Sequence, residues 1–168
     1  ANTIEAKVFE TKQAIQDGAD EIDVVVNIGR AKNGDFEYVK NELTKIKKVA
    51  KNHVVKAILE TCYMDENEIV KLCKVCMRAK VDFVKTSTGF AILKNEDGSL
   101  KPNGATTHHV KLMHTTVGAE LSVKASGGIR TASDAIKMLE AGATRIGTSA
   151  GIQIIEAWDE SIKIKGWD

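Results

Sequence analysis

The stretch Asp82-Phe83-Val84-Lys85-Thr86-Ser87-Thr88-Gly89-Phe90 joins an apolar strand pattern to a lysine and a turn of small residues. Phe83 and Val84 are typical of a buried strand, whereas a lysine is rarely buried without a partner or a chemical role. Burial and a nearby positive charge both favour the neutral amine, which attacks carbonyl groups. Lys85 is therefore a candidate for forming a Schiff base. The alternative is a lysine at the strand end that reaches into solvent.

Three further strand-like stretches contain a charged residue within an apolar run. They are residues 21–27, 54–61 and 123–130, which carry Asp23, Lys56 and Lys124. Because side chains alternate between the two faces of a strand, Lys56 is expected to share its face with Ile58 and Glu60. If the charged faces of the four strands point toward one another, three lysines and a carboxylate meet in one interior. That arrangement would be costly in a purely structural core, so it indicates a functional site.

Strand and helix patterns alternate along the chain. Helices are expected at residues 3–18, 35–51, 65–80, 106–117, 131–142 and 152–158, a last strand at 144–148, and loops at 29–34 and 91–105. This alternation favours βαβ units and a parallel sheet. Charged residues inside strands, with glycines after them, favour a TIM barrel, whose functional sites lie at the carboxyl ends of the strands.

The number of strands is smaller than a closed barrel requires. About five strands are expected in these 168 residues, whereas a closed barrel has eight. The length is that of one domain. The sequence therefore predicts an α/β fold of the (β/α)8 TIM-barrel type over residues 1–168, present as an incomplete barrel of about five βα units.

Charge and composition argue against binding to nucleic acid or to a membrane. The 24 basic and 23 acidic residues nearly balance, so no excess of positive charge attracts a phosphate backbone or an acidic bilayer. No apolar run is long enough to span a membrane, and the N-terminal residues lack the pattern of a signal peptide. The odd number of cysteines, three, fits a reducing cytoplasm. Cys73 and Cys76 are expected to pack within a helix rather than to bind zinc.

Two glycine-containing turns follow the last two strands, Gly127-Gly128-Ile129-Arg130 and Gly147-Thr148-Ser149. Each precedes an expected helix, and backbone N–H groups in that position bind phosphate. TIM barrels often place a phosphate site after their last two strands. The alternative is that the glycines only supply positive φ angles for tight turns. The two turns together favour a phosphate site.

These motifs resemble those of the 2-deoxyribose-5-phosphate aldolase family, which are class I aldolases on a TIM barrel. The resemblance covers nearly the whole chain and rests on residues 21–25, 82–90, 123–131 and 145–149. It implies that Lys85 is the Schiff-base nucleophile and that Lys124 is a neighbouring amine whose charge favours the neutral form of Lys85. It implies that Asp23 is the acid/base, acting through water. Phosphate and substrate binding is implied for Gly89, Gly127, Gly128, Gly147 and Ser149. Lys56, grouped with them, matches a further charged position near the site, and its role stays open.

The implied function is the reversible cleavage of 2-deoxy-D-ribose 5-phosphate to D-glyceraldehyde 3-phosphate and acetaldehyde, in cytoplasmic deoxynucleoside catabolism. The implied partner is a small sugar phosphate, with homo-oligomers possible and no metal or organic cofactor, because an iminium is itself the electron sink. Two alternatives stay open. One is another Schiff-base aldolase or a transaldolase. The other is an inactive shortened barrel that only binds sugar phosphate or self-associates.

The sequence departs from the family pattern in three places. The family has about three strands before the first helix expected here, so we expect a fragment, a complement from elsewhere or an assembly of incomplete barrels. The segment 91–104 is longer than the family's usual turn, and Phe90 replaces a lysine seen in some members. The tail at residues 163–168 lacks the C-terminal tyrosine that some members use.

Overall fold

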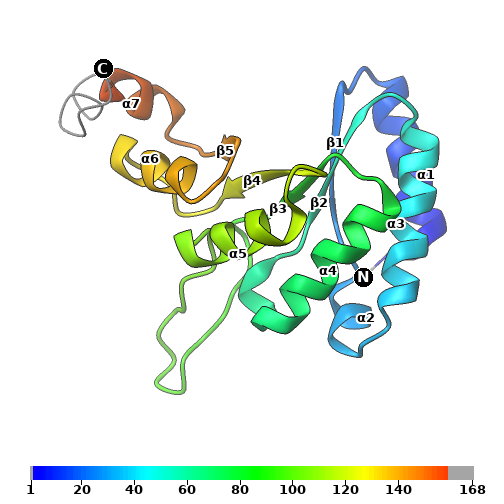
Figure 1. Ribbon diagram of the computed structural model, residues 1–168, viewed down its shortest axis with the longest axis horizontal. Coiled ribbons are helices and arrows are strands. Elements are labelled where there is room, and N and C mark those ends of the chain that lie inside the picture. Colours follow the sequence, from blue (N-terminus) through cyan, green and yellow to red (C-terminus); the bar gives the residue numbers. More distant parts are fainter. Residues whose placement is uncertain (1, 159–168) are drawn as a thin grey trace.

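The computed structural model describes residues 2–158 as a curved parallel sheet covered by helices (Figure 1). The strands are β1 (Glu21–Val25), β2 (Val54–Ile58), β3 (Phe83–Lys85), β4 (Ser122–Ser126) and β5 (Arg145–Gly147). They pair in chain order, β1-β2-β3-β4-β5, and every pair is parallel. The prediction of an incomplete α/β barrel with five strands is confirmed for the described part of the chain.

Most of the helices begin directly after a residue whose side chain caps them, whereas the last described helix, which follows Ala150, has no such cap. The helices are α1 (Ile4–Gln16), α2 (Ile28–Lys32), α3 (Phe36–Ala50), α4 (Glu66–Ala79), α5 (Thr107–Val117), α6 (Ala132–Glu140) and α7 (Gly151–Glu156), with a 3-10 helix η1 (Thr61–Tyr63). Side chains of Thr3, Asp35, Asp65, Thr106 and Thr131 each accept an N–H from the first turn of the helix that follows. These caps satisfy donors that a helix leaves unpaired at its start.

Two local expectations are wrong. Residues 29–34 are not all loop, because Asn27 caps the short helix α2 by accepting the N–H of Arg30 at 3.1 Å. The strand expected over residues 54–61 ends at Ile58. Glu60 instead has a left-handed backbone, with φ 42° and ψ 61°, so it does not lie on the strand face of Lys56.

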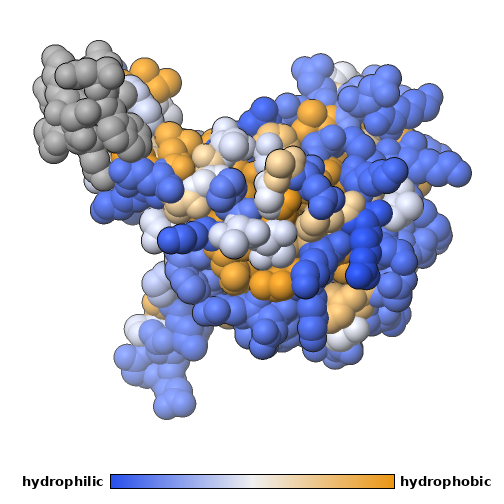
Figure 2. All heavy atoms as spheres, viewed as in Figure 1, coloured by the Kyte–Doolittle hydropathy of each residue, from blue (hydrophilic) through white to orange (hydrophobic). Residues whose placement is uncertain are grey.

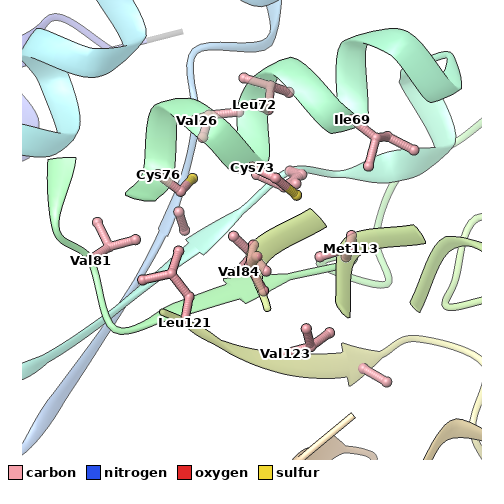
Figure 3. Packing of buried hydrophobic residues seen from close by; sticks show 14 of the residues in the cluster. Val26, Ile69, Leu72, Cys73, Cys76, Val81, Val84, Met113, Leu121 and Val123 are labelled. Carbon is pink, nitrogen blue, oxygen red and sulfur yellow. The ribbon is translucent and has the colours of Figure 1, made fainter. Parts of the chain in front are cut away.

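The core lies between the sheet and the helices on its outer side. Val84 points from β3 into this core, and α4 packs over it with Ile69, Leu72 and Cys73 (Figure 3). Cys76 is buried in the same layer, so the prediction that both cysteines pack in the core is confirmed. Burial raises the pKa of Cys73 to about 12, which keeps its thiol protonated near neutral pH. The apolar residues of the strands thus point toward the helices, and the charged residues lie on the opposite face of the sheet.

The segment 91–104 forms a projecting arm between β3 and α5, in keeping with the loop expected there (Figure 1). One antiparallel bridge joins Lys94 to Leu100 within it, and its tip is hydrophilic (Figure 2). The Asn103 side chain closes the base by donating to the carbonyl of Gly89 at 3.4 Å and to that of Ala91. The arm therefore extends away from the sheet, while hydrogen bonds hold its two ends together.

Within the described residues, no helix has the length and apolar character needed to cross a bilayer. The C-terminal tail at residues 163–168, which lacks the tyrosine of some family members, lies outside the described part of the chain.

Replacing Ile69 with alanine is expected to lower the free energy of unfolding by about 2–5 kcal/mol, because the side chain is fully buried and leaves a cavity. The matched variant Ile152→Ala removes the same atoms from a side chain that is 71% exposed. That variant is expected to change the free energy of unfolding by less than about 0.5 kcal/mol. Urea denaturation followed by circular dichroism measures both values. Equal losses in the two variants would contradict the described packing of α4.

Candidate active site

The strand register brings the charged residues of neighbouring strands into one group. Asp23 of β1 lies opposite Lys56 of β2. Lys85 of β3 lies opposite Lys124 of β4, and Lys124 lies opposite Arg145 of β5. Like charges placed opposite each other on adjacent strands destabilise a sheet. The arrangement therefore needs compensating negative charge on the same face.

Asp23 supplies that charge by accepting hydrogen bonds from three lysines. The Nζ atoms of Lys85 and Lys124 donate to the same oxygen, Oδ2, at 2.8 Å and 2.9 Å. Lys56 Nζ donates to the other oxygen, Oδ1, at 2.8 Å. Two amines therefore lie within reach of a single oxygen atom, as the alternation of side chains along β3 and β4 predicts.

A second carboxylate, that of Glu21, also forms an ion pair with Lys56. Glu21 Oε2 lies 2.5 Å from Lys56 Nζ, and it also accepts from Arg145 of the opposite edge strand. The side chain of Lys56 is only 4% exposed. Burial alone would lower the pKa of Lys56, but its hydrogen bonds to Asp23 and Glu21 outweigh burial and raise it. Lys56 is therefore a fixed ammonium group and not a source of free amine.

The group contains more cations than anions. Lys56, Lys85, Lys124 and Arg145 face only Asp23 and Glu21 as acidic ion-pair partners in the described structure (the latter shared by two of the cations). An excess of positive charge favours loss of a proton from one of the cations. Lys56 has two carboxylate partners, whereas Lys85 and Lys124 share one oxygen of Asp23, so these two lysines have the least compensated positive charge among the three.

The same contacts keep Asp23 ionised. Burial alone would raise the pKa of Asp23, but hydrogen bonds from Lys56, Lys85 and Lys124 outweigh it and hold this pKa well below its ordinary value. Asp23 in this arrangement accepts protons only weakly. A proton needed during a reaction would come from an ammonium group beside it.

Lys85 and Lys124 line a cavity of about 390 Å³ at the carboxyl ends of the strands. Its lining also contains the residues predicted to bind substrate and phosphate: Gly89, Gly127, Gly128, Gly147 and Ser149. Asp23 and Lys56 are not among the lining residues, and Asp23 contacts the two lining lysines through its Oδ2. Thr88, Phe90 and Arg130 line the cavity as well, although none of them is among the individually predicted site residues.

Two glycines allow close approaches that a side chain would block. A Cβ at Gly147 would lie 2.8 Å from the Cβ of Ser126 and 3.2 Å from the Cε of Lys124, so this glycine leaves room for the lysine. A Cβ at Gly104, at the end of the arm, would overlap the carbonyl of Gly127. The Ala105 N–H donates to the Gly127 carbonyl at 3.0 Å, which joins the arm's base to the turn after β4.

Some of the missed residues have a sequence signal and others do not. Glu21 and Arg145 each lie two positions before a predicted site residue on the same strand, so strand alternation could have placed them on the charged face. Glu60 has no such signal, because its position depends on a left-handed turn. Gly104 has none either, since its contact joins segments that are distant in sequence.

Residues 1–157 match the family described as DeoC/LacD family aldolase. A protein named deoxyribose-phosphate aldolase from a Thermoanaerobacter species is 52% identical over 163 residues, which covers 95% of this chain and 69% of that protein. A protein named deoxyribose-phosphate aldolase 1 from Staphylococcus aureus is 53% identical over 156 residues, covering 93% and 66%. The chain thus spans about two thirds of the length of these relatives.

Solved structures agree with these matches. A protein described as QR15, an aldolase, superposes with a TM-score of 0.85 at 42% identity and covers 97% of this chain and 69% of its own. A deoxyribose phosphate aldolase from Aeropyrum pernix, described as having a unique tetrameric structure, superposes with a TM-score of 0.81 at 33% identity. That comparison covers 95% of this chain and 64% of the other.

The Asp23→Asn variant is expected to lose stability in a pH-dependent way. Because the pKa of Asp23 is lower in the folded chain than in the unfolded one, its ionised form stabilises the fold above its ordinary pKa of about 4. This contribution is lost as the pH falls toward the folded-state pKa. The difference in unfolding free energy between wild type and variant is therefore largest near neutral pH and shrinks below about pH 4. Urea titrations over this range measure it, and a constant difference would contradict the ion cluster.

Proposed function

Because this chain belongs to the DeoC/LacD family of aldolases, we propose that it is a class I aldolase acting on 2-deoxy-D-ribose 5-phosphate. It cleaves this sugar phosphate reversibly to D-glyceraldehyde 3-phosphate and acetaldehyde. Relatives about half identical to it carry the name deoxyribose-phosphate aldolase. The observation that supports the proposal best is that Lys85 and Lys124, beside the cavity, both donate to one oxygen of Asp23.

The first step forms a covalent bond between enzyme and substrate. The neutral amine of Lys85 adds to the aldehyde carbon, and the resulting carbinolamine loses water to give an iminium ion. The ammonium of Lys124 supplies the proton that leaves with the hydroxyl group as water. Asp23 stays ionised, holds both lysines in position and stabilises the positive charge of the iminium.

The second step breaks the bond between the second and third carbons of the sugar. The amine of Lys124, neutral after giving up its proton in the first step, removes the proton of the hydroxyl group on the third carbon, which becomes the aldehyde of D-glyceraldehyde 3-phosphate. The bonding electrons move to the iminium and form an enamine on Lys85. The ammonium of Lys124 protonates the terminal carbon of the enamine, which gives the iminium of acetaldehyde. Addition of one water molecule then releases acetaldehyde, restores the amine of Lys85 and returns one proton to Lys124.

The phosphate binds among the glycine-containing turns that line the cavity. The turns after β3, β4 and β5 meet there, and they contain Gly89, Gly127, Gly128, Gly147 and Ser149. Backbone N–H groups in such turns bind anions, and Arg130 adds a positive charge to the lining. Anchoring the phosphate fixes the distance of the aldehyde from Lys85, which is how binding energy promotes the reaction.

Two less specific proposals concern where and in which assembly the chain works. A relative from Aeropyrum pernix is described as tetrameric, and we propose that this chain also forms homo-oligomers, which light scattering would test. All three cysteines are free thiols, which supports a reducing cytoplasm. Cell fractionation would test that location.

The Lys85→Ala variant is expected to abolish trapping of acetaldehyde by borohydride, because the amine that forms the Schiff base is absent. Intact-mass measurement detects the trapped ethyl group in the wild type and its loss in the variant. The exposed arm lysine gives a matched control, since Lys94→Ala should trap acetaldehyde normally. Trapping that persists in Lys85→Ala would exclude this nucleophile. Trapping with dihydroxyacetone phosphate instead of acetaldehyde would favour a different Schiff-base aldolase.

The Lys124→Leu variant is expected to require a higher pH for the same rate of trapping. Removing one positive charge beside Asp23 leaves the remaining amine better compensated, which favours its protonated and unreactive form. Measuring trapping rates across a pH series, with wild type in parallel, gives the shift. Superimposable pH profiles would contradict the coupling of the two lysines.

A further inference from the structure

We propose that Glu60 is a positioning residue for the phosphate end of the substrate, an inference that rests on the proposed function. Its side chain carries a carboxylate, yet the residue is only 3% exposed. Carboxylates are seldom buried without a cation beside them. Among the described residues no lysine, arginine or histidine forms an ion pair with Glu60. The hydrogen-bond partners of this buried charge therefore identify its role.

The carboxylate of Glu60 holds both polar groups of Thr88, which lines the cavity. The Thr88 N–H donates to Oε1 at 3.1 Å, and the Thr88 hydroxyl donates to Oε2. The same hydroxyl oxygen accepts the N–H of Phe90 at 3.1 Å. The turn of residues 88–90 is thus tied to Glu60 through main chain and side chain. Gly89, at its centre with φ 86°, lines the proposed phosphate end.

The backbone of Glu60 is held in place by hydrogen bonds of the residues directly before and after it. A left-handed conformation is uncommon for a residue with a side chain, and such conformations concentrate at functional sites. The N–H of Leu59 donates to the carbonyl of Lys85 at 2.9 Å, and the N–H of Thr61 donates to that of Thr86 at 2.9 Å. Glu60 is therefore fixed against the segment that carries the proposed nucleophile, and its side chain reaches the turn that follows.

The charge of Glu60 requires that it act through Thr88. A carboxylate in the lining would repel a phosphate group, and Glu60 is not among the lining residues. Its hydrogen bonds are charge-assisted, so they hold the turn more firmly than neutral ones would. Loss of these bonds should release the turn around Gly89 and weaken phosphate binding. It should leave Lys85, which is bonded to Asp23 instead, able to form a Schiff base.

The Glu60→Gln variant tests this role. Glutamine keeps the size of the side chain but replaces one acceptor oxygen with an amide donor, so one Thr88 donor loses its acceptor. The KM for cleavage of 2-deoxy-D-ribose 5-phosphate is expected to rise about tenfold. Borohydride trapping of acetaldehyde, which carries no phosphate, is expected to stay at the wild-type rate. Both are measured on the same preparation.

Two further variants separate positioning from a general loss of stability. Asp82 lies at the opposite end of β3, where it accepts the N–H of Val55 at 2.7 Å, so Asp82→Asn makes the same chemical change far from the cavity. It is expected to leave KM unchanged. Thr88→Val removes the hydroxyl group that donates a hydrogen bond to Glu60. The double variant with Glu60→Gln should have a KM no higher than that of the single variant with the larger effect.

Each outcome supports or overturns the inference. A raised KM with normal trapping, together with a non-additive double variant, supports it. An unchanged KM in Glu60→Gln, or a rise matched by Asp82→Asn, overturns it while the proposed function stands. Loss of trapping in Glu60→Gln also overturns it, because Glu60 would then affect the lysines. A wild-type chain that traps no acetaldehyde would overturn the proposed function, and this inference with it.

Discussion

One carboxylate shared by three ammonium groups is the constraint on which the site depends. Asp23 can accept from Lys56, Lys85 and Lys124 only if β1, β2, β3 and β4 are parallel, adjacent and in the observed register. A shift of one residue in any of these strands would turn its charged side chain toward the apolar layer under the helices. Core packing on one face and charge compensation on the other therefore select the same register.

The three lysines differ because their partners differ. Lys56 is enclosed and has two carboxylates, which gives it a permanent charge. Lys85 and Lys124 share one oxygen of Asp23, and both line the cavity, so they are the two lysines that a substrate can reach. The same residue type therefore serves as a buried fixed charge at Lys56 and as an accessible amine at Lys85 and Lys124, according to the carboxylates and the cavity around it.

Sequence reasoning succeeded where the controlling interactions are local and periodic. Alternation along each strand gave the face of Lys85 and of Lys124, and the expectation that these faces meet agrees with their shared contact to Asp23. The side chains that cap helices predicted where most helices start. Sequence reasoning failed at Glu60, which was expected to continue the strand of Lys56. Glu60 instead has a left-handed backbone, and its side chain is held by hydrogen bonds to Thr88, a residue distant in sequence. The short helix α2 was missed because its glycine and asparagine residues are also typical of loops.

The base of the arm has a consequence for how this protein can vary. Asn103 and Gly104 attach the end of the arm to the turns beside the cavity, while the hydrophilic tip contacts solvent (Figure 2). Length at the tip is therefore uncoupled from the geometry of the lysines, since extending a solvated loop costs little chain entropy. Insertions or deletions in natural homologues should accumulate near Gly98, and a peptide tag or fluorophore attached there would report on the protein without disturbing its chemistry.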